Sequence, residues 1–364
     1  MNESQALIAL NSASQVGPVR IRLMLSHFGS ALDAFQASPS DWSELPGFHP
    51  KVIQGLIDCK ASDRWREDLE EVERRGVSLI AFTDPHYPKR LRGLPDAPVV
   101  LYVKGELLPK DEKSLAVIGT RGASIYGAEM SKQLSSDLSQ QGFTIVSGLA
   151  RGIDTAAHQA TLEAGGRTIA VIGSGLSKLY PKENGLLAEW ISQQGAVISE
   201  FPMLTPPDRQ QFPQRNRIVS GLCMGVLLVE APERSGALIT VEKALQQGNR
   251  VVFALPGRAD TPHFRGNHAL LKSGKALLIE SAEDIAGHFG ELFTRPVKTS
   301  AMPLEIDERQ LLDQMPEQEL AIDELLTLTK LPIPKLTVLL MSLVLKRAVK
   351  EFPGKIYKKV IYKG

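Results

Sequence analysis

The middle of the chain carries the feature that most constrains its fold, a series of short apolar runs rich in β-branched residues. Segments long enough to form a helix separate most of these runs, which are Leu115–Gly119, Phe143–Ser147, Thr168–Ile172, Ala196–Ser199, Val226–Val229, Val251–Ala254 and Ala276–Ile279. Strands that are apolar along their whole length are buried on both faces, and strands that alternate with helices pair in parallel through right-handed crossovers. The sequence therefore predicts an α/β domain with a parallel sheet and helices on both faces.

The pattern changes on both sides of this sheet. Before it, apolar residues recur three and four positions apart, as in packed helices; after it, three helical segments and a hairpin are typical of a winged helix. A proline-rich connector over residues 76–113, with a short strand at Val99–Val103, opens the central domain. The predicted segments are a helical domain over residues 1–75, the central domain over residues 76–290, a linker over residues 291–302 and a winged-helix-like domain over residues 303–364.

Two turns in the N-terminal segment are candidate DNA contacts. Gln15-Val16-Gly17-Pro18 and Leu45-Pro46-Gly47-Phe48 each lie between helical stretches, which is the pattern of paired helix-hairpin-helix elements. The glycine of such a turn lets backbone N–H groups approach a phosphate at a helix N-terminus. A tight turn between packed helices is the alternative, and it fits the second turn better because Phe48 and His49 stand where a further glycine would help.

Composition favours a cytoplasmic protein without a membrane anchor. No stretch approaches the roughly 20 apolar residues that a membrane span needs, and the start MNESQALIAL lacks the basic residues and long apolar stretch of a secretion signal. Cys59 and Cys223 lie far apart, without the spacing of metal ligands or of a disulfide framework. The net charge of +1 is uninformative, so nucleic-acid binding must rest on local patches.

Polar and flexible residues follow the predicted strands, at the edge of the sheet where open α/β folds bind ligands. The segments there are Gly119–Gly127, Ser147–Asp154, Gly173–Lys178, Tyr180–Asn184, Glu230, Ser235–Thr240, Pro256-Gly257 and Gly266-Asn267, together with Phe212–Arg217, which we place before the helix that precedes the fifth strand. Glycines and small hydroxyl residues at helix N-termini expose backbone N–H groups that favour anions.

Cations and aromatic rings alternate within these loops. Arg121 can grip a phosphate with two parallel hydrogen bonds, and Lys178, Arg215 and Arg217 extend the positive surface. Tyr180 and Phe212 are flat groups on which bases can stack. This arrangement suits a flexible nucleic-acid strand better than one small ligand, although Arg215 and Arg217 could instead pair with carboxylates such as Glu200 and Glu230.

Motifs for nucleotide-driven or cofactor chemistry fail at particular positions. The dinucleotide fingerprint is broken because Lys178 stands where the third glycine belongs, and the phosphate-binding loop of nucleotide hydrolases fails around Gly274-Lys275. The sequence contains no Cys/His cluster and no His-Glu-x-x-His motif. We therefore expect no cofactor, no metal and no catalytic residues.

At these loops the sequence closely resembles the DNA-processing protein A family, also called Smf. The matching segments are GTRGASIYG, SGLARGIDTAAH, YPKEN, FPQRNRIVSGL, VEAPERSGALIT and PGR followed by GNHALLKSGKALL, which span Ser114 to about Ile279. The resemblance implies an extended Rossmann-like central domain that binds single-stranded DNA. It also implies loading of the recombinase RecA during natural transformation, displacement of single-strand-binding protein, and a homodimer formed through the central domain.

The resemblance also implies which residues contact DNA. It makes Arg121, with Gly119 and Ser124, the main phosphate pocket, and it keeps a hydroxyl at Thr120, where the family usually has serine. It adds Lys178 as a backbone contact, and on the same rim it places Asn184, Arg215, Asn216 and Arg217. Our stacking hypothesis adds Tyr180. The full set of candidate DNA-binding residues is Gly119, Thr120, Arg121, Ser124, Gly127, Ser147, Gly148, Gly173, Gly175, Lys178, Tyr180, Asn184, Arg215, Asn216, Arg217, Ser235, Gly236 and Asn267.

Two other hypotheses stay open. A nucleotide phosphoribohydrolase on a related core would use Gly236 and Glu242 at matching offsets, but Leu238 and Ile239 replace the glycine and threonine that approach its phosphate. A duplex-DNA regulator would use the C-terminal segment, where residues 330–364 carry nine basic groups and one acidic group. Winged helices serve both as duplex binders and as protein-docking modules, and the sequence does not decide between these roles.

Overall fold

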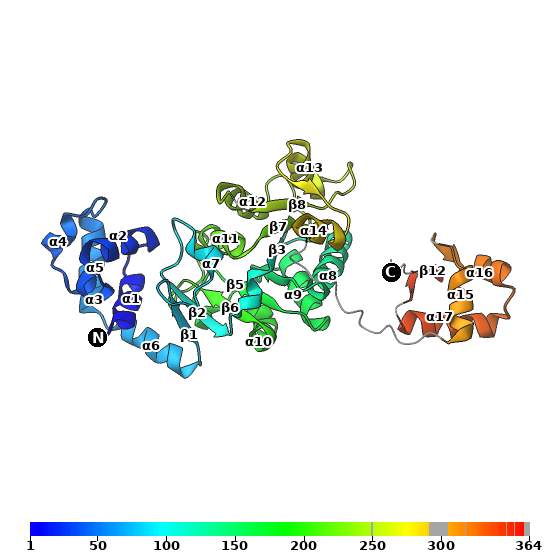
Figure 1. The fold of residues 1–364 in the computed structure, drawn as a ribbon, viewed down its shortest axis with the longest axis horizontal. Coiled ribbons are helices and arrows are strands. Elements are labelled where there is room, and N and C mark those ends of the chain that lie inside the picture. The colour runs from blue at the N-terminus through cyan, green and yellow to red at the C-terminus, as the bar shows by residue number, and fades with distance from the viewer. Residues whose placement is uncertain (249, 291–304, 317, 347, 353, 360–364) are drawn as a thin grey trace. The chain divides into compact units, whose positions relative to one another are not determined.

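The computed structural model describes residues 1–364 apart from residues 249, 291–304, 317, 347, 353 and 360–364. The chain divides into two compact units, Met1–Arg295 and Pro296–Gly364, each with its own hydrophobic core (Figure 1). The predicted linker over residues 291–302 lies outside the described residues.

A nine-stranded sheet runs through the larger unit in the order β1-β2-β6-β5-β4-β3-β7-β8-β9. From β6 to β9 neighbouring strands pair in parallel, whereas β2 pairs antiparallel with both β1 and β6. The strands are β1 Ser78–Ala81, β2 Val100–Gly105, β3 Ser114–Ile118, β4 Thr144–Ser147, β5 Thr168–Val171, β6 Ala196–Ser199, β7 Gly225–Leu228, β8 Val251–Ala254 and β9 Leu277–Leu278. The predicted mostly parallel sheet is confirmed, and each predicted strand lies within a residue or two of its expected bounds.

Helices cover both faces of this sheet. Successive strand residues point to opposite faces, so Leu115 and Val117 of β3 belong to one core and Ala116 and Ile118 belong to the other. One face packs against α7, α11 and α12, and the opposite face packs against α8, α9, α10 and α14. The bounds are α7 Lys89–Arg92, α8 Ile125–Gln140, α9 Ile153–Glu163, α10 Gly185–Gln194, α11 Gln211–Leu222, α12 Ala237–Gln246, α13 Arg265–Lys272 and α14 Ala282–Phe289.

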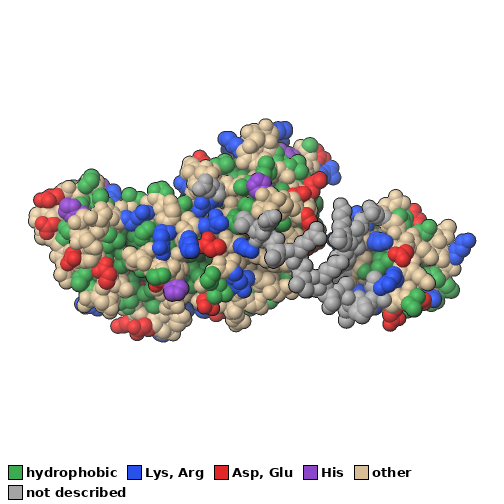
Figure 2. Space-filling view, in the orientation of Figure 1, with side chains coloured by type: hydrophobic (Ala, Val, Ile, Leu, Met, Phe, Trp, Pro, Cys, Tyr) green, Lys and Arg blue, Asp and Glu red, His purple; other side chains and the backbone are tan. Residues whose placement is uncertain are grey.

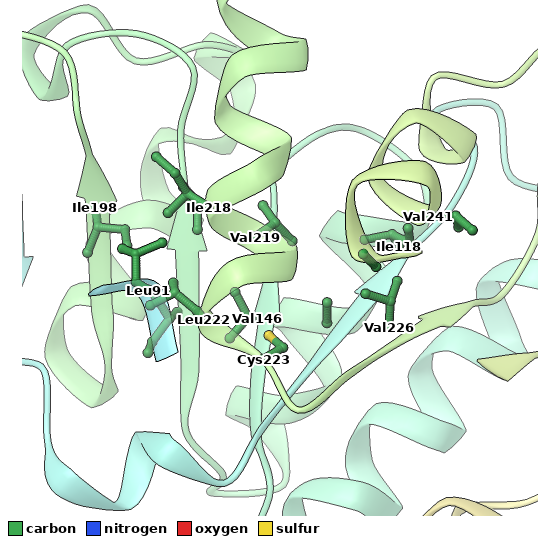
Figure 3. Close-up of a cluster of buried hydrophobic side chains, with 14 of the residues drawn as sticks. Leu91, Ile118, Val146, Ile198, Ile218, Val219, Leu222, Cys223, Val226 and Val241 are labelled. Atoms are coloured by element: carbon green, nitrogen blue, oxygen red, sulfur yellow. The ribbon is translucent and has the colours of Figure 1, made fainter. Parts of the chain in front are cut away.

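Helix α11 is fixed to the sheet by its apolar side. Figure 3 shows Ile218, Val219 and Leu222 in one cluster with Val146 of β4 and Val226 of β7. All five side chains are at least 94% buried, so their removal from water stabilises this packing. The packing places the start of α11 at the carboxyl ends of the strands.

Our expectation that Phe212–Arg217 precedes a helix is wrong, because the segment forms the first half of α11. In the structure Pro213 lies in the first helical turn, where a backbone N–H has no partner inside the helix, so proline is tolerated there.

The N-terminus is helical, as predicted, and it packs directly on the sheet. Its helices are α1 Glu3–Ser12, α2 Pro18–Phe28, α3 Ala31–Gln36, α4 Pro39–Ser43, α5 Pro50–Ala61 and α6 Arg64–Arg74. Their shared core includes Trp42 and Leu56 and extends to Val100 and Tyr102 of β2. The opposite face of β2 contributes Leu101 to the core under α11. Strand β2 therefore joins the N-terminal helices to the sheet, and β1, which the sequence analysis missed, pairs along its edge.

The smaller unit has the winged-helix architecture that the sequence predicted. Its elements are α15 Ile306–Gln314, β10 Leu320–Ala321, α16 Ile322–Thr329, α17 Ile333–Leu345, β11 Val349–Phe352 and β12 Ile356–Lys359. The strands form a sheet in the order β10-β12-β11. Among the described residues no single helix could cross a membrane; only α16 and α17 taken together, bent by 112°, have the length and composition for it.

Candidate nucleic-acid interface

A cleft of about 780 Å³ opens at the carboxyl ends of the parallel strands. Its walls come from the loops after β3, β4, β5, β6 and β7 and from the first turns of α11 and α12. Half of the predicted DNA-binding residues line it, namely Gly119, Thr120, Arg121, Gly148, Tyr180, Arg215, Asn216, Ser235 and Gly236. The fold thus brings together residues from five separate segments of the chain.

Phe212 contacts both a cation and a second ring in this cleft. The guanidinium carbon of Arg121 is 5.3 Å from the centroid of the Phe212 ring, a distance at which a cation is attracted to an aromatic ring. The ring of Tyr180 lies 5.8 Å from that of Phe212 at an angle of 49°. Gly173 permits this arrangement, because a Cβ there would lie 2.9 Å from the Phe212 ring. The cleft therefore combines a positive charge with a pair of aromatic rings.

Three exposed arginines on the cleft walls have no anionic partner. Within the described part of the chain, Arg121, Arg209 and Arg234 make neither an ion pair nor a hydrogen bond. Each guanidinium offers five N–H donors in a planar fork that matches phosphate oxygens. Anions with several phosphates would satisfy all three side chains at once.

Arg215 lies below the cleft rather than on its rim. Its side chain is buried and donates to the carbonyl oxygens of Gly148 and Val171, and its Nε donates to Asn216 Oδ1 at 3.1 Å. Burial lowers the pKa of Arg215 to about 10, so the group is still charged at neutral pH. Arg215 thus ties the strand-end loops together and adds positive charge to the cleft floor.

Asp154 balances part of that charge. It is buried at the start of α9 and accepts hydrogen bonds from the backbone N–H groups of Gly148 at 3.0 Å and Ala150 at 3.3 Å. Burial raises the pKa of Asp154, and the nearby Arg215 opposes that shift. The sequence analysis did not select Asp154, although it belongs to the SGLARGIDTAAH segment that carries the family resemblance.

Arg217 lies outside the cleft, in a buried ion pair. Its Nη2 is 2.5 Å from Glu200 Oε2, and its Nε is 3.3 Å from Asp96 Oδ2. The sequence analysis left open that Arg215 or Arg217 pairs with a carboxylate such as Glu200, and in the structure Arg217 does so. Burial raises the pKa of Glu200, and Arg217 opposes that rise.

Ser124 and Gly127 surround a buried carboxylate. Ser124 donates through its backbone N–H and its hydroxyl to Glu230, at 3.1 and 2.6 Å, and its hydroxyl accepts from the backbone N–H of Gly127. A Cβ at position 127 would overlap the Glu230 carboxylate. Both residues therefore support the end of β7, and neither lines the cleft.

Most of the other predicted residues outside the cleft hold its loops in place. Asn184 donates to Leu149 O and Asn267 donates to Leu228 O, both from buried positions. Ser147 donates to Val117 O at 2.6 Å, and Gly175 packs against backbone carbonyls of the loop before α11. Lys178 is exposed on the short turn that follows β5.

The sequence analysis also missed Arg209 and Arg234. Arg234 lies within the VEAPERSGALIT segment, so its charge at a strand end was a usable signal. Arg209 lies in Pro206–Gln211, which has no motif, and only the folded loop brings it to the cleft.

Not every group of cations on the larger unit is free for a ligand. Figure 2 shows Lys and Arg side chains in the region of α7 and α11 on the face in view. In α7 itself, Arg90 lies 3.6 Å from a carboxylate oxygen of Glu112, and Arg92 donates to the backbone of Asp84. These arginines hold the unit together, which distinguishes them from the three exposed arginines of the cleft.

Glu242, the residue that a phosphoribohydrolase would use, is exposed on α12 and is not among the residues that line the cleft. The cleft instead contains Ile239 and Thr240 of that helix. The geometry gives no support to the enzyme hypothesis.

Fold and site together define a multidomain Rossmann-like protein with a cationic, aromatic cleft at its strand ends. The chain belongs to the DNA recombination-mediator protein A family, whose model matches residues 78–290. The model of the DprA winged helix domain matches residues 295–355. The family resemblance read from the strand-end motifs is therefore confirmed.

Individual relatives agree with this assignment. Protein Smf of Synechocystis sp. is 32% identical over 98% of this chain and 99% of its own length, and the DNA processing protein DprA of Bacillus subtilis is 42% identical over 70% and 80%. The X-ray structure of DNA processing protein A from Streptococcus pneumoniae has a TM-score of 0.68 and 36% identity, covering 78% of this chain and 97% of that one. A structure from Helicobacter pylori, described by its single-stranded DNA binding mode, has a TM-score of 0.53 and 28% identity, covering 60% and 97%.

Proposed function

We propose that this protein binds single-stranded DNA in the strand-end cleft, without nucleotide hydrolysis, and loads the recombinase RecA onto incoming strands during natural transformation. A role in DNA processing is supported by the family, and the Helicobacter pylori relative is described by its binding of single-stranded DNA. The observation that carries the proposal is Arg121, an exposed guanidinium above the Phe212 ring with no anionic partner among the described residues.

The chemistry of the cleft favours a single strand over a duplex. Phosphates bind the cations, whereas Phe212 and Tyr180 offer aromatic faces on which only unpaired bases can stack. Because phosphates and ring faces are common to all nucleotides, binding is expected to show little sequence preference and to weaken steeply with salt. The cleft thus suits DNA that enters the cell as a single strand of any sequence.

The test is fluorescence anisotropy with a labelled mixed-sequence single strand and the matching duplex, each at two salt concentrations. Arg121→Ala is expected to weaken single-strand binding at least tenfold, because it removes a charge-assisted phosphate contact and the cation over Phe212. Arg64→Ala, which removes an exposed arginine of α6 outside the cleft, is the matched control. Unchanged affinity of Arg121→Ala, or a preference for the duplex, would reject the assignment.

The recombinase step needs its own measurement. RecA filament formation on a strand coated with single-strand-binding protein is expected to accelerate when this protein is added, and Arg121→Ala is expected not to accelerate it. Sedimentation of the protein alone would test the homodimer that the family implies. If the protein binds DNA but never accelerates filament formation, DNA binding stands and recombinase loading does not.

A further inference from the structure

A second hollow, of about 920 Å³, is lined by the continuation of a loop that also lines the cleft. Gly119, Thr120 and Arg121 of the loop after β3 line the cleft, and Ser124 and Tyr126, a few residues further along, line the second hollow. Its other wall is the segment Pro256–Phe264 after β8. A ligand that extends from Arg121 along this loop therefore reaches the second hollow.

One side of the second hollow is apolar and presents an aromatic ring. Pro256, Pro262 and Phe264 line it together with Tyr126. The Tyr126 ring packs 5.8 Å from that of the buried Phe264, and 48% of the residue is exposed. A ring held in place from within the protein and open to solvent can stack a flat ligand.

A fixed polar group also faces the second hollow. His263 Nδ1 lies 2.9 Å from Glu230 Oε1, and the Glu230 side chain is fully buried. Because a carboxylate accepts hydrogen bonds, this contact places a hydrogen on Nδ1 and sets the orientation of the imidazole. Within the described chain no hydrogen bond engages Nε2 of His263, which leaves that atom for the polar edge of a ligand.

The charges around the second hollow disfavour a phosphate there. Arg258 already pairs with Asp260 at 2.7 Å. Burial raises the pKa of Tyr126, and the negative charge of Glu280 adds to that shift. The pairing with Asp260 leaves no free cation of Arg258 for a phosphate, and the negative charge of Glu280 would repel one, whereas a neutral base with a flat face and polar edges fits the same surroundings.

We propose that the second hollow is a base-binding subsite, in which a base of the bound strand stacks on Tyr126 and meets His263 at its edge, while a neighbouring phosphate lies at Arg121. This subsite rests on the proposed function, because it extends the path of the same single strand. It makes the footprint of the protein longer than the cleft alone provides.

The experiment uses one single strand of fixed length in which an abasic site is moved stepwise along the sequence. With the wild-type protein, one position is expected to lose about tenfold in affinity when its base is removed, in addition to any loss from the cleft. With Tyr126→Ala the whole strand is expected to bind about tenfold more weakly, and the abasic site at that position then costs nothing further, because both changes remove the same contact. Tyr126→Phe keeps the ring and is expected to behave like the wild type.

Leu245→Ala, at an exposed apolar residue of α12, is the control for loss of an exposed side chain. If Tyr126→Ala leaves affinity unchanged, or if the abasic site at that position still lowers affinity in this variant, the subsite is refuted while the cleft stands. If the wild-type protein does not bind single strands at all, the proposed function and the subsite fall together.

Discussion

The carboxylate of Asp68 accepts a hydrogen bond from the backbone N–H of Met203 at 2.5 Å, and so joins α6 to the loop that leads into α11. One turn later on α6, Glu71 accepts from the Ser177 hydroxyl at 2.6 Å. The two loops also bond to each other, since Ser177 N–H donates to Met203 O at 3.0 Å. Helix α6 thus holds both loops whose ends carry the aromatic rings of the cleft.

Removal of this anchor is expected to loosen the cleft as well as the fold. Asp68→Ala leaves the buried Tyr102 hydroxyl and the Met203 N–H without an acceptor and should lower the free energy of unfolding by about 2–3 kcal/mol. Single-strand affinity should also fall, whereas Asp68→Asn, which keeps an acceptor, should lose less of both. Urea unfolding and anisotropy measure the two effects, and Glu73→Ala on the exposed side of α6 should change neither.

The close contact between the loop at Gly175 and the loop at Pro202 and Met203 predicts that a methyl group at Gly175 strongly lowers stability. A Cβ at Gly175 would lie 2.1 Å from the backbone oxygen of Pro202 and 2.2 Å from that of Met203, so the loops must separate. Gly175→Ala should therefore lower the free energy of unfolding by about 2 kcal/mol or more. Gly122→Ala, where nothing lies within 4 Å, is the control and should stay within about 0.5 kcal/mol of the wild type. Equal stability of the two variants would contradict the contact.

Substitution of Arg217 should mainly lower stability, whereas substitution of Arg121 should mainly lower the affinity for single-stranded DNA. Arg217→Ala leaves the buried Glu200 carboxyl without its ion-pair partner and should cost about 3–5 kcal/mol of stability. The fraction that stays folded at low temperature should still bind single strands as the wild type does, because Arg217 does not line the cleft. Arg121→Ala should show the reverse, with normal unfolding and weak binding. A folded Arg217 variant that has lost its affinity would assign this arginine to the DNA contact.

The buried His158 predicts an acid-dependent loss of stability. Burial lowers its pKa to about 3, with Arg215 adding to the shift, whereas an unfolded chain has the ordinary value near 6.5. Between these values only the unfolded state takes up the proton, so stability falls as the pH drops below about 6.5. The change is about tenfold in the folding equilibrium for each pH unit.

The measurement is urea unfolding of the wild type and of His158→Gln between about pH 7 and pH 4. Glutamine keeps a polar partner for Thr168, which lies 2.7 Å from His158 Nδ1, but it does not titrate. The variant should lose less stability than the wild type on acidification. Parallel pH profiles would show that His158 does not carry the effect.

The sheet could be predicted because its signal is local. Runs such as Ile169–Val171 and Val251–Ala254 are apolar at every position, and the structure packs them between two layers of helices. The strand-end rule then located Arg121 and Gly148 correctly at the cleft. Strand β1 was missed because Ser78–Ala81 lies at the edge of the sheet, where only its pairing with β2 reveals it.

The roles of individual side chains were harder to predict, because they depend on contacts between distant segments. Arg215 and Arg217 are two positions apart on α11, yet one lines the cleft and the other is paired 17 positions back along the chain with Glu200. Ser124 lies in a segment that resembles a phosphate-binding loop, but its backbone N–H and its hydroxyl donate hydrogen bonds to Glu230, 106 positions away. No local pattern contains that information.

Strand β2 has a consequence for how this family can vary. Val100 and Tyr102 face the N-terminal helices and Leu101 faces the opposite core, so both surfaces of this strand are interior. A chain that began at residue 76 would present Val100 and Tyr102 to water. The N-terminal helices are therefore part of the core of this unit. A chain without them would need polar residues in place of Val100 and Tyr102.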